Sequence, residues 1–435
     1  MNALMRRPSR MAALAAGVAA ALAGLVGPVG ADPAGVHASV QAAAEGAVLY
    51  AGHPQSIPDS YVVVLRDGQQ GRAVDAAAAD LAARYGATVR FTYRAALAGF
   101  AVRADAAQAR RLAADPAVAY VAQDRTVGLA DDAVAPKPVA ADARTGTDVF
   151  VQPNPPSWGL DRIDERSRPV DLKYHYPSTA PSVKAYIIGT GIRYTHQEFG
   201  GRATLGVDTV GDGLNGNDCN GSGTYISGIV GGATVGIAKA VRLRSVRVLG
   251  CTGSGTFAQV LAGVDWITAD ALANPTVRGV ANMSVGGGPY QPLDDAVTAS
   301  IAANVHYSVA AGGSASNACN FSPARVPRAT TVGATDSADN RAPFSSFGPC
   351  LDLFAPGMAI YSTWHTADNT YNTISGTTPA TSHASGAAAL WRQRFPADNA
   401  DQVATALAVN ATPGVVVNPG AGSPNLLLFM GMIPM

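Results

Sequence analysis

The sequence carries little charge and no excess of either sign. Lysine and arginine total 31, aspartate and glutamate total 31, and charged residues make up 14% of the 435 positions. No basic run is long enough to follow a nucleic-acid backbone, so no nucleic-acid partner is expected. Hydrophobic residues make up 48% of the chain, which is enough for one large core and a smaller second domain.

Long apolar runs are also scarce, and the one clear case lies at the N-terminus. Three arginines precede an apolar stretch at 11–27, and small residues follow at 29–31. This order is typical of a secretory signal peptide, here residues 1–31. A transmembrane anchor is the alternative, but the stretch is short and rich in glycine and alanine, and no second apolar span follows it. We therefore expect a secreted, extracellular protein with no membrane attachment after signal removal.

Cysteine is rare as well. The four cysteines allow three pairings, of which the sequential one closes two loops of similar span. A zinc site is the rival interpretation, but no pair is spaced as Cys-x-x-Cys and no histidine cluster accompanies them. Two disulfides are the stronger prediction for an exported chain. The cysteines are Cys219, Cys251, Cys319 and Cys350.

The first half of the chain predicts a small domain between two irregular segments. Residues 32–56 are rich in alanine and glycine and are expected to be flexible. From 57 to 128 the order strand, helix, strand, strand, helix, strand predicts a ferredoxin-like α+β domain. Residues 129–157 contain scattered prolines without periodicity and are expected to form an exposed linker. The elements of the small domain are expected at 60–66, 73–86, 88–93, 97–104, 105–115 and 118–124.

Residues 158–435 alternate apolar strands with helices, which predicts a doubly wound, mainly parallel α/β sheet. Such folds place their site beyond the carboxyl ends of the strands. Small residues leave those ends at 189–191, 286–288 and 312–313, where glycine lets a ligand backbone approach closely. Strands are expected at 183–188, 242–249, 278–285, 304–311 and 330–334, and helices at 257–273 and 292–303.

The stretch ISGTTPATSHASG at 374–386 runs from a small-residue turn into Thr378 and Pro379. Proline is accepted in the first turn of a helix and threonine is a fair cap, so the stretch predicts a helix that begins here. A sharper interpretation is a nucleophile at a helix N-terminus, where backbone N–H groups stabilise an oxyanion.

Seven motifs of the large domain resemble those of the subtilases, which are secreted serine endopeptidases, and most closely those of the proteinase K and aqualysin branch. The resemblance implies a subtilisin-like fold and an inhibitory propeptide domain at 57–128 that assists folding. It also implies the sequential disulfides Cys219–Cys251 and Cys319–Cys350. The motifs are PSWGLDRID (156–164), GTGIRYTHQEFGGRA (189–203), RVLGCTGSGT (247–256), ANMSVGGG (281–288), CNFSPARVP (319–327), LDLFAPG (351–357) and GSPNLLL (422–428).

The resemblance also locates the catalytic positions, and this chain differs from the family at each. Gly189 stands where the family has its aspartate, Ser222 where it has its histidine, and Thr378 where it has its serine. Gly313 stands where the family has the asparagine that donates to the oxyanion. Thr378 keeps a hydroxyl, but a hydroxyl is a weak nucleophile without a base in reach. We therefore expect no functional catalytic residue and predict a non-catalytic homologue, a pseudoprotease. The alternative is a secreted, calcium-dependent serine endopeptidase with weak residual activity.

The resemblance also implies a groove in which an extended peptide pairs with two edge segments. Strand addition there would take its affinity from main-chain hydrogen bonds and its selectivity from side-chain pockets. The alternative, that these segments are only tightly packed turns, stays open. The expected partners are a peptide segment in the groove and the chain's own propeptide domain, and the expected state is a monomer. The groove residues are Gly253, Ser254, Gly255, Ser284, Val285 and Gly286, with Ala310, Ala311 and Gly312 as walls of the main specificity pocket.

Structural calcium is the expected cofactor. Carboxylates gather near the start of the large domain, and oxygen donors of this kind suit calcium. The resemblance implies one site there, although Lys173 replaces a ligand of some relatives, and a second site further along the chain. The alternative for either set is a solvated acidic face. The two ligand sets are Asp161, Asp164, Glu165 and Asp171, and Asp352 with the backbone carbonyls of Pro327 and Ala329.

Overall fold

The computed structural model describes residues 45–66, 71–131, 137–139, 151–431 and 433. The chain divides into two units, Met1–Ala43 and Ala44–Met435, and all described residues belong to the second. The predicted signal peptide, residues 1–31, lies outside the described residues. Within the described residues, no helix combines the length and the apolar character that a membrane crossing requires.

The small domain has the predicted order of strands and helices. Its strands lie in the order β1-β5-β2-β4-β3, and β5 pairs in parallel with β1 and antiparallel with β2. Side chains of both helices pack on one face of the sheet, for example Leu81 and Leu112 against Phe100 and Val63. The elements are β1 (Val48–Leu49), β2 (Ser56–Leu65), α1 (Arg72–Tyr85), β3 (Thr88–Tyr93), β4 (Gly99–Arg103), α2 (Ala106–Ala113) and β5 (Val118–Leu129).

Local sequence explains where these two helices begin and end. Asp105 and Gln108 form a capping box at the start of α2, in which each side chain accepts from the other residue's backbone N–H. Gly86 ends α1 in the left-handed conformation, with φ of 70°, which glycine adopts without a steric penalty.

The large domain is built on a nine-stranded sheet in the order β10-β11-β9-β13-β15-β16-β17-β21-β20. All neighbours pair in parallel except β20 with β21. The strand order reverses its direction at β9, so the predicted doubly wound α/β sheet is confirmed. The strands are β9 (Val183–Gly189), β10 (Ala203–Asp208), β11 (Arg242–Arg247), β13 (Arg278–Met283), β15 (Val305–Ala310), β16 (Thr330–Thr335), β17 (Leu353–Pro356), β20 (Thr412–Pro413) and β21 (Leu426–Leu427).

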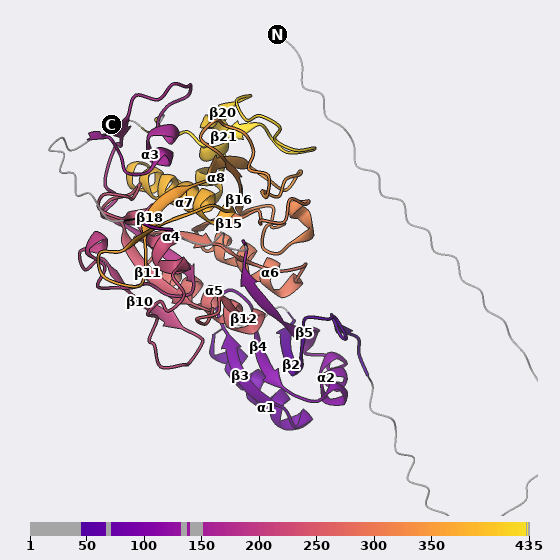
Figure 1. Cartoon of the computed structure of the whole chain (residues 1–435). Coiled ribbons are helices and arrows are strands. Elements are labelled where there is room, and N and C mark those ends of the chain that lie inside the picture. Colours follow the sequence, from indigo (N-terminus) through magenta and orange to yellow (C-terminus); the bar gives the residue numbers. More distant parts are fainter. Residues whose placement is uncertain (1–44, 67–70, 132–136, 140–150, 432, 434–435) are drawn as a thin grey trace, which may run out of the picture. The chain divides into compact units, whose positions relative to one another are not determined.

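Helices cover both faces of this sheet (Figure 1). Along β9, Ala185 and Ile187 join one apolar cluster, whereas Tyr186 and Ile188 join the other, because successive strand residues face opposite sides. The first cluster includes α4 and α7, and the second includes α5 and α6. These helices are α4 (Ser222–Gly231), α5 (Phe257–Ala273), α6 (Gln291–Ala302) and α7 (Thr377–Arg394); α8 (Ala400–Asn410) packs against α7, and α3 (Trp158–Ile163) against β17.

Shorter elements and two disulfides complete the large domain. The structure joins Cys219 to Cys251 and Cys319 to Cys350, which confirms the predicted pairing. The remaining elements are β8 (Lys173–His175), η1 (Gln197–Phe199), β12 (Ser254–Thr256), β14 (Val285–Gly286), η2 (Ala318–Asn320), β18 (Ile360–Thr363) and β19 (Tyr371–Ile374).

Two segments expected to be irregular contain regular pairing. In the segment 32–56, β1 pairs with β5, because Val48 and Leu49 complete the edge of the small sheet. In the expected linker 129–157, β6 (Lys137–Val139) pairs with β19 and β7 (Val151–Pro153) pairs with β8. The expectations of a flexible segment and an exposed linker are therefore wrong where these strands lie, since main-chain pairing with distant strands leaves no periodic signal in the sequence.

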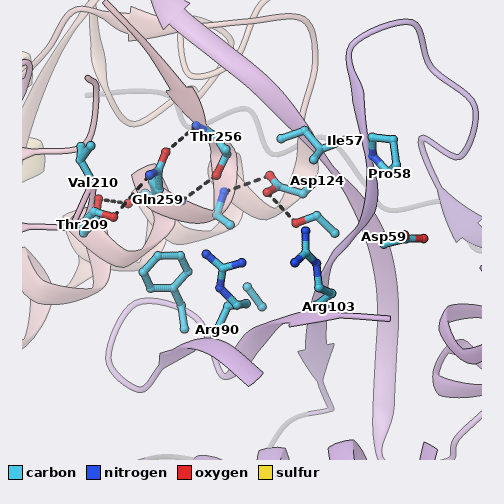
Figure 2. A pocket seen from close by; sticks show the side chains of 14 residues that line it. Ile57, Pro58, Asp59, Arg90, Arg103, Asp124, Thr209, Val210, Thr256 and Gln259 are labelled. Atoms are coloured by element: carbon cyan, nitrogen blue, oxygen red, sulfur yellow. Dashed lines mark hydrogen bonds between the residues drawn. The ribbon is translucent and has the colours of Figure 1, made fainter. Parts of the chain in front are cut away.

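Carboxylates bond backbone N–H groups across the junction of the small and large domains. Asp265 of α5 accepts hydrogen bonds from the backbone N–H groups of Arg94, Ala95 and Ala96, at 2.6 to 2.9 Å. Asp124 of β5 accepts at 3.1 Å from the backbone N–H of Ala258 in the first turn of α5. Beside Asp124 lies a cavity of about 170 Å³, lined by side chains of both domains (Figure 2).

Candidate peptide-binding and catalytic site

The strand β5 passes from the small sheet into a groove of the large domain. Its last residues pair antiparallel with β12 on one side, where Gly128 faces Ser254, and with β14 on the other, where Leu129 faces Val285. The backbone N–H of Leu129 donates to the carbonyl of Gly253 at 3.2 Å, and that of Ala130 donates to the carbonyl of Ser284 at 3.0 Å. The two predicted edge segments are thus brought together around an extended stretch of this same chain.

The groove ends at the carboxyl edge of the large sheet, where the three expected triad positions lie. Gly189 is the last residue of β9, Ser222 is the first residue of α4, and Thr378 lies in the first turn of α7. Ser222 and Thr378 line one cavity of about 50 Å³, together with Tyr225, Trp364 and other residues. A Cβ built on Gly189 would meet no atom within 4 Å, so the space beside this strand end is open. That these are the catalytic positions stays a prediction.

Gly313 and the start of α7 contact the chain that leaves the groove. The backbone N–H of Gly313 donates to the carbonyl oxygen of Ala130 at 3.1 Å. The carboxylate of Asp131 accepts from the backbone N–H of Thr378 at 2.6 Å and from the hydroxyl of Thr377 at 2.8 Å. Asp131 had been assigned to the linker, and no local motif in the sequence marks it as a site residue.

The three residues predicted to wall the specificity pocket, Ala310, Ala311 and Gly312, do not all face the site. Ala310 is the last residue of β15, and Ala311 and Gly312 follow it; the backbone N–H of Gly312 donates to the Thr377 hydroxyl at 3.1 Å. Ala311 is fully buried in a separate apolar cluster with Ala318 and Leu351. The role of these residues in a specificity pocket stays a prediction.

Two histidines, His383 and His365, lie near the site, whereas Ser222 occupies the position where the family has its histidine. His383 is buried within α7, and burial lowers its pKa to about 4. Its Nδ1 lies 2.8 Å from the carbonyl of Pro379, so that nitrogen is engaged within the helix. His365, for which the sequence analysis gives no role, lies beside the start of α4: a Cβ on Gly221 would come within 2.7 Å of its Nδ1. That Nδ1 is buried and has no hydrogen-bond partner among the residues that the structure describes.

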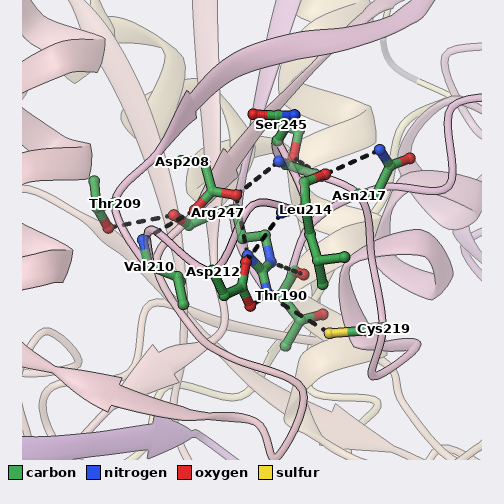
Figure 3. Close-up of polar contacts among 12 residues, drawn as sticks. Thr190, Asp208, Thr209, Val210, Asp212, Leu214, Asn217, Cys219, Ser245 and Arg247 are labelled. Carbon is green, nitrogen blue, oxygen red and sulfur yellow. Dashed lines mark hydrogen bonds and ion pairs between the residues drawn. The ribbon is translucent and has the colours of Figure 1, made fainter.

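A buried arginine fixes the loop that approaches the end of β9 (Figure 3). Arg247, fully buried at the end of β11, pairs with Asp208 at 3.0 Å and with Asp212 at 2.6 Å. Its Nε donates to the carbonyl of Thr190 at 3.1 Å. The arginine holds the pKa of Asp212 low, at about 2. The network therefore positions the residue next to Gly189 without contacting the groove segment itself.

The start of α4 is fixed by another carboxylate, that of Asp218. It accepts from the hydroxyl of Thr190 at 2.9 Å and from the backbone N–H and hydroxyl of Thr224, at 2.8 and 2.6 Å. The strand end and the first turn of α4 are thereby held together at Ser222.

The first predicted calcium set is partly assembled. Asp161, Glu165 and Asp171 place one carboxylate oxygen each within 4.8 Å of one another. Asp164 is directed elsewhere, because its Oδ2 accepts from the backbone N–H of His175 at 2.6 Å; burial raises its pKa to about 7. Lys173 lies 3.4 Å from Asp171 and brings a competing positive charge.

The second predicted set has less support from the contacts. Asp352 accepts from the backbone N–H of Thr331 at 2.7 Å, and burial raises its pKa to about 6. No described contact brings the carbonyls of Pro327 and Ala329 to this carboxylate, so the second site stays a prediction.

Comparison with known families places the chain. The model of the subtilase family (Peptidase_S8) matches residues 123–428, and that of peptidase inhibitor I9 matches residues 60–130. This chain belongs to the subtilase family, and it carries the inhibitor domain in front of the peptidase domain.

Individual relatives agree with this assignment. The chain is 44% identical over 394 residues to an extracellular serine proteinase of Thermus sp. (strain Rt41A). The match covers 86% of this chain and 90% of that protein. It is 42% identical over 345 residues to alkaline serine exoprotease A of Vibrio alginolyticus, across 79% of this chain and 61% of that protein. Among solved structures, a cold-adapted subtilisin-like serine proteinase matches with a TM-score of 0.60 and 45% identity, across 64% of this chain and 98% of that one.

These comparisons correct the prediction that the chain is not an enzyme. Relatives that match it over most of its length are named as a serine proteinase and a serine exoprotease, and the solved structure that matches 64% of the chain is a subtilisin-like serine proteinase. The prediction was wrong because it read the residue types at four positions as a loss of turnover. Residue types state which groups are present, but they do not measure a rate.

Proposed function

We propose that this chain is a secreted, calcium-dependent serine endopeptidase of low turnover that cuts extended peptides held between β12 and β14. The observation that supports this best is the position of β5. It lies between the two edge segments as a bound peptide would, with its main chain bonded to Gly253 and Ser284. A groove that holds an extended chain in this way positions one peptide bond for attack.

The proposed scissile bond joins Ala130 to Asp131. The carbonyl of Ala130 receives the N–H of Gly313, which would stabilise negative charge on that oxygen during attack. The hydroxyl of Thr378, which lines the adjoining cavity, would be the nucleophile. Gly189 and Ser222 bring neither a carboxylate nor an imidazole to this hydroxyl, and low turnover is proposed for that reason.

His365 is the proposed proton acceptor. Its Nδ1 is buried beside Gly221 with no hydrogen-bond partner in the described part of the chain. Its ring contacts that of Trp364, which lines the same cavity as Thr378. A general base of this kind contributes about 10²–10⁴-fold to a rate.

Calcium and secretion complete the proposal. Asp161, Glu165 and Asp171 would hold calcium, which would stabilise the start of the large domain when bound. The N-terminal pattern at 1–31 and the extracellular location in the name of the Thermus relative support export.

The test is cleavage of a fluorogenic peptide that contains the order Gly-Leu-Ala-Asp, with the products identified by mass spectrometry. We expect slow turnover that is lost in Thr378→Ala and reduced about 10²-fold or more in His365→Gln. The matched control is His53→Gln, which removes an exposed imidazole of the small domain. Equal cleavage by the protein and by Thr378→Ala would contradict the proposal.

A further inference from the structure

The aspartate that follows the groove segment lies in a fitted site. One oxygen of its carboxylate accepts from the backbone N–H of Thr378 at 2.6 Å, and the other accepts from the hydroxyl of Thr377 at 2.8 Å. Both donors belong to the first turn of the 18-residue helix α7, where the helix dipole favours a negative charge. A carboxylate is therefore the group that these donors suit.

The hydroxyl of Thr377 is committed to this contact. Thr377 is fully buried, and its oxygen accepts the backbone N–H of Gly312 at 3.1 Å. Because a hydroxyl has a single proton, that proton is directed to the carboxylate of Asp131. The site thus presents a fixed donor to an acceptor.

Two glycines make room for the carboxylate. A Cβ on Gly313 would lie 2.8 Å from Oδ1 of Asp131, and a Cβ on Gly376 would lie 2.6 Å from its Oδ2. Any other residue at either position would meet the carboxylate at less than a van der Waals distance. The site is consequently shaped by glycine on both sides of the acid.

The charge of Asp131 is balanced by the helix alone. Among the described residues, no lysine, arginine or histidine forms an ion pair with it; its recorded bonds go to Thr377 and Thr378. Recognition through fixed backbone and hydroxyl donors distinguishes an acid from its amide, since an amide nitrogen turned to either donor would oppose it.

We propose that Gly313, Gly376, Thr377 and Thr378 form a carboxylate receptor at the end of the groove. Asp131 fills it in the uncut chain and holds β5 in place. The receptor selects peptides with an acidic side chain directly after the residue at the Ala130 position. This inference rests on the proposed endopeptidase role of the groove for its substrate, but the latch formed by Asp131 does not depend on turnover.

The latch is tested by amide hydrogen exchange of the full chain, read at Leu129 and Ala130. Asp131→Asn should speed exchange at these amides about tenfold or more, because a charge-assisted hydrogen bond is replaced by a weaker one. Asp80→Asn, which removes an exposed carboxylate of α1, should leave it unchanged. Unchanged exchange in Asp131→Asn would overturn the latch.

The close fit of Gly313 around the carboxylate, called the cradle below, is tested by a double-mutant cycle in the same assay. Gly313→Ala should also speed exchange, and the pair Gly313→Ala with Asp131→Ala should be no faster than Asp131→Ala alone, because both changes remove one contact. A fully additive pair would mean that Gly313 acts elsewhere and would overturn the cradle.

Selectivity is tested by binding in trans to full-length Asp131→Ala. A labelled peptide containing Gly-Leu-Ala-Asp should bind at least about tenfold more tightly than its Gly-Leu-Ala-Asn counterpart, measured by fluorescence anisotropy. Equal affinities would overturn the receptor and leave Asp131 as an internal helix cap only. Because neither assay measures cleavage, a failure of the receptor is distinguishable from a failure of the proposed enzyme.

Discussion

Asp124 of β5 and Asp131, which lies two residues beyond the end of β5, each accept an N–H at the start of a helix of the large domain, and they differ in what surrounds them. Asp124 accepts the N–H of Ala258 at the start of α5, and its side chain is enclosed by both domains, with 2% of the residue exposed. Asp131 accepts the N–H of Thr378 at the start of α7, where the chain leaves the groove. The first contact joins whole domains, whereas the second holds only the end of a strand.

Enclosure also sets the ionisation of the buried acid. Burial raises the pKa of Asp124, although hydrogen bonds from Ala258, Ser60 and Arg125 oppose that shift. Helix N-termini thus serve different purposes within one protein. A carboxylate that is enclosed among its partners fixes the interface between two domains. A carboxylate at the open end of the groove can be replaced by another carboxylate.

The largest effect that sharpens this comparison is expected from Asp124→Ala. The change leaves the buried N–H of Ala258 and the partly buried hydroxyl of Ser60 without this acceptor, and we expect the free energy of unfolding to fall by about 2 kcal/mol. Urea denaturation measures the loss, with the exposed Asp80→Ala as its control at less than about 1 kcal/mol.

Amide exchange in the same variant locates the change. It should rise throughout the small domain, whereas Asp131→Asn should affect only the end of β5. A small domain that stays protected in Asp124→Ala would break the distinction between the two aspartates.

An intermediate effect is expected from removal of calcium. If Asp161, Glu165 and Asp171 hold the ion, chelation lowers the melting temperature, because a ligand stabilises the state that binds it by RT ln(1 + [L]/Kd). Asp171→Asn should reduce the dependence on calcium. Differential scanning fluorimetry with and without chelator measures both.

Calcium should affect the contacts of neither Asp124 nor Asp131. Exchange at the end of β5 should be the same with and without the ion at temperatures well below melting. If chelation leaves the melting temperature unchanged, the proposed calcium dependence is wrong.

The smallest effect concerns the stability of the protein at low pH. Arg247 lowers the pKa of Asp212 to about 2, so the ionised carboxylate is favoured in the folded protein. Its contribution to stability is present above the ordinary aspartate value and is lost as the pH falls from about 4 to about 2. Asp212→Asn should therefore flatten the fall in melting temperature over this range, whereas Asp80→Asn should not. An unchanged acid profile in Asp212→Asn would contradict this.

Sequence reasoning located the elements whose signals are local. The helix expected at 257–273 has these bounds in the structure, where Thr256 and Gln259 form a capping box ahead of an apolar run. The strands around Gly189 were predicted because buried parallel strands are continuously apolar. The disulfide pairing required the resemblance, since four cysteines by themselves leave three possibilities open.

Sequence reasoning missed what depends on distant pairing. Ala130 and Asp131 carry no periodic signal, and their partners Gly313 and Thr378 lie some 180 to 250 positions further along the chain. Nothing in the sequence around His365 indicates that it packs beside the start of α4. The groove and its occupant therefore required coordinates.

The sharing of β5 between two sheets has a consequence for solubility. The strands β12 and β14 are short, at three and two residues, and each offers unpaired main-chain groups toward the groove once β5 departs. Open strand edges of this kind attract other chains and start aggregation. While β5 stays, the chain shields these edges with its own backbone. Their shortness limits what can be added after β5 leaves, so the freed protein pairs with a brief stretch of peptide more readily than with a whole strand of another copy.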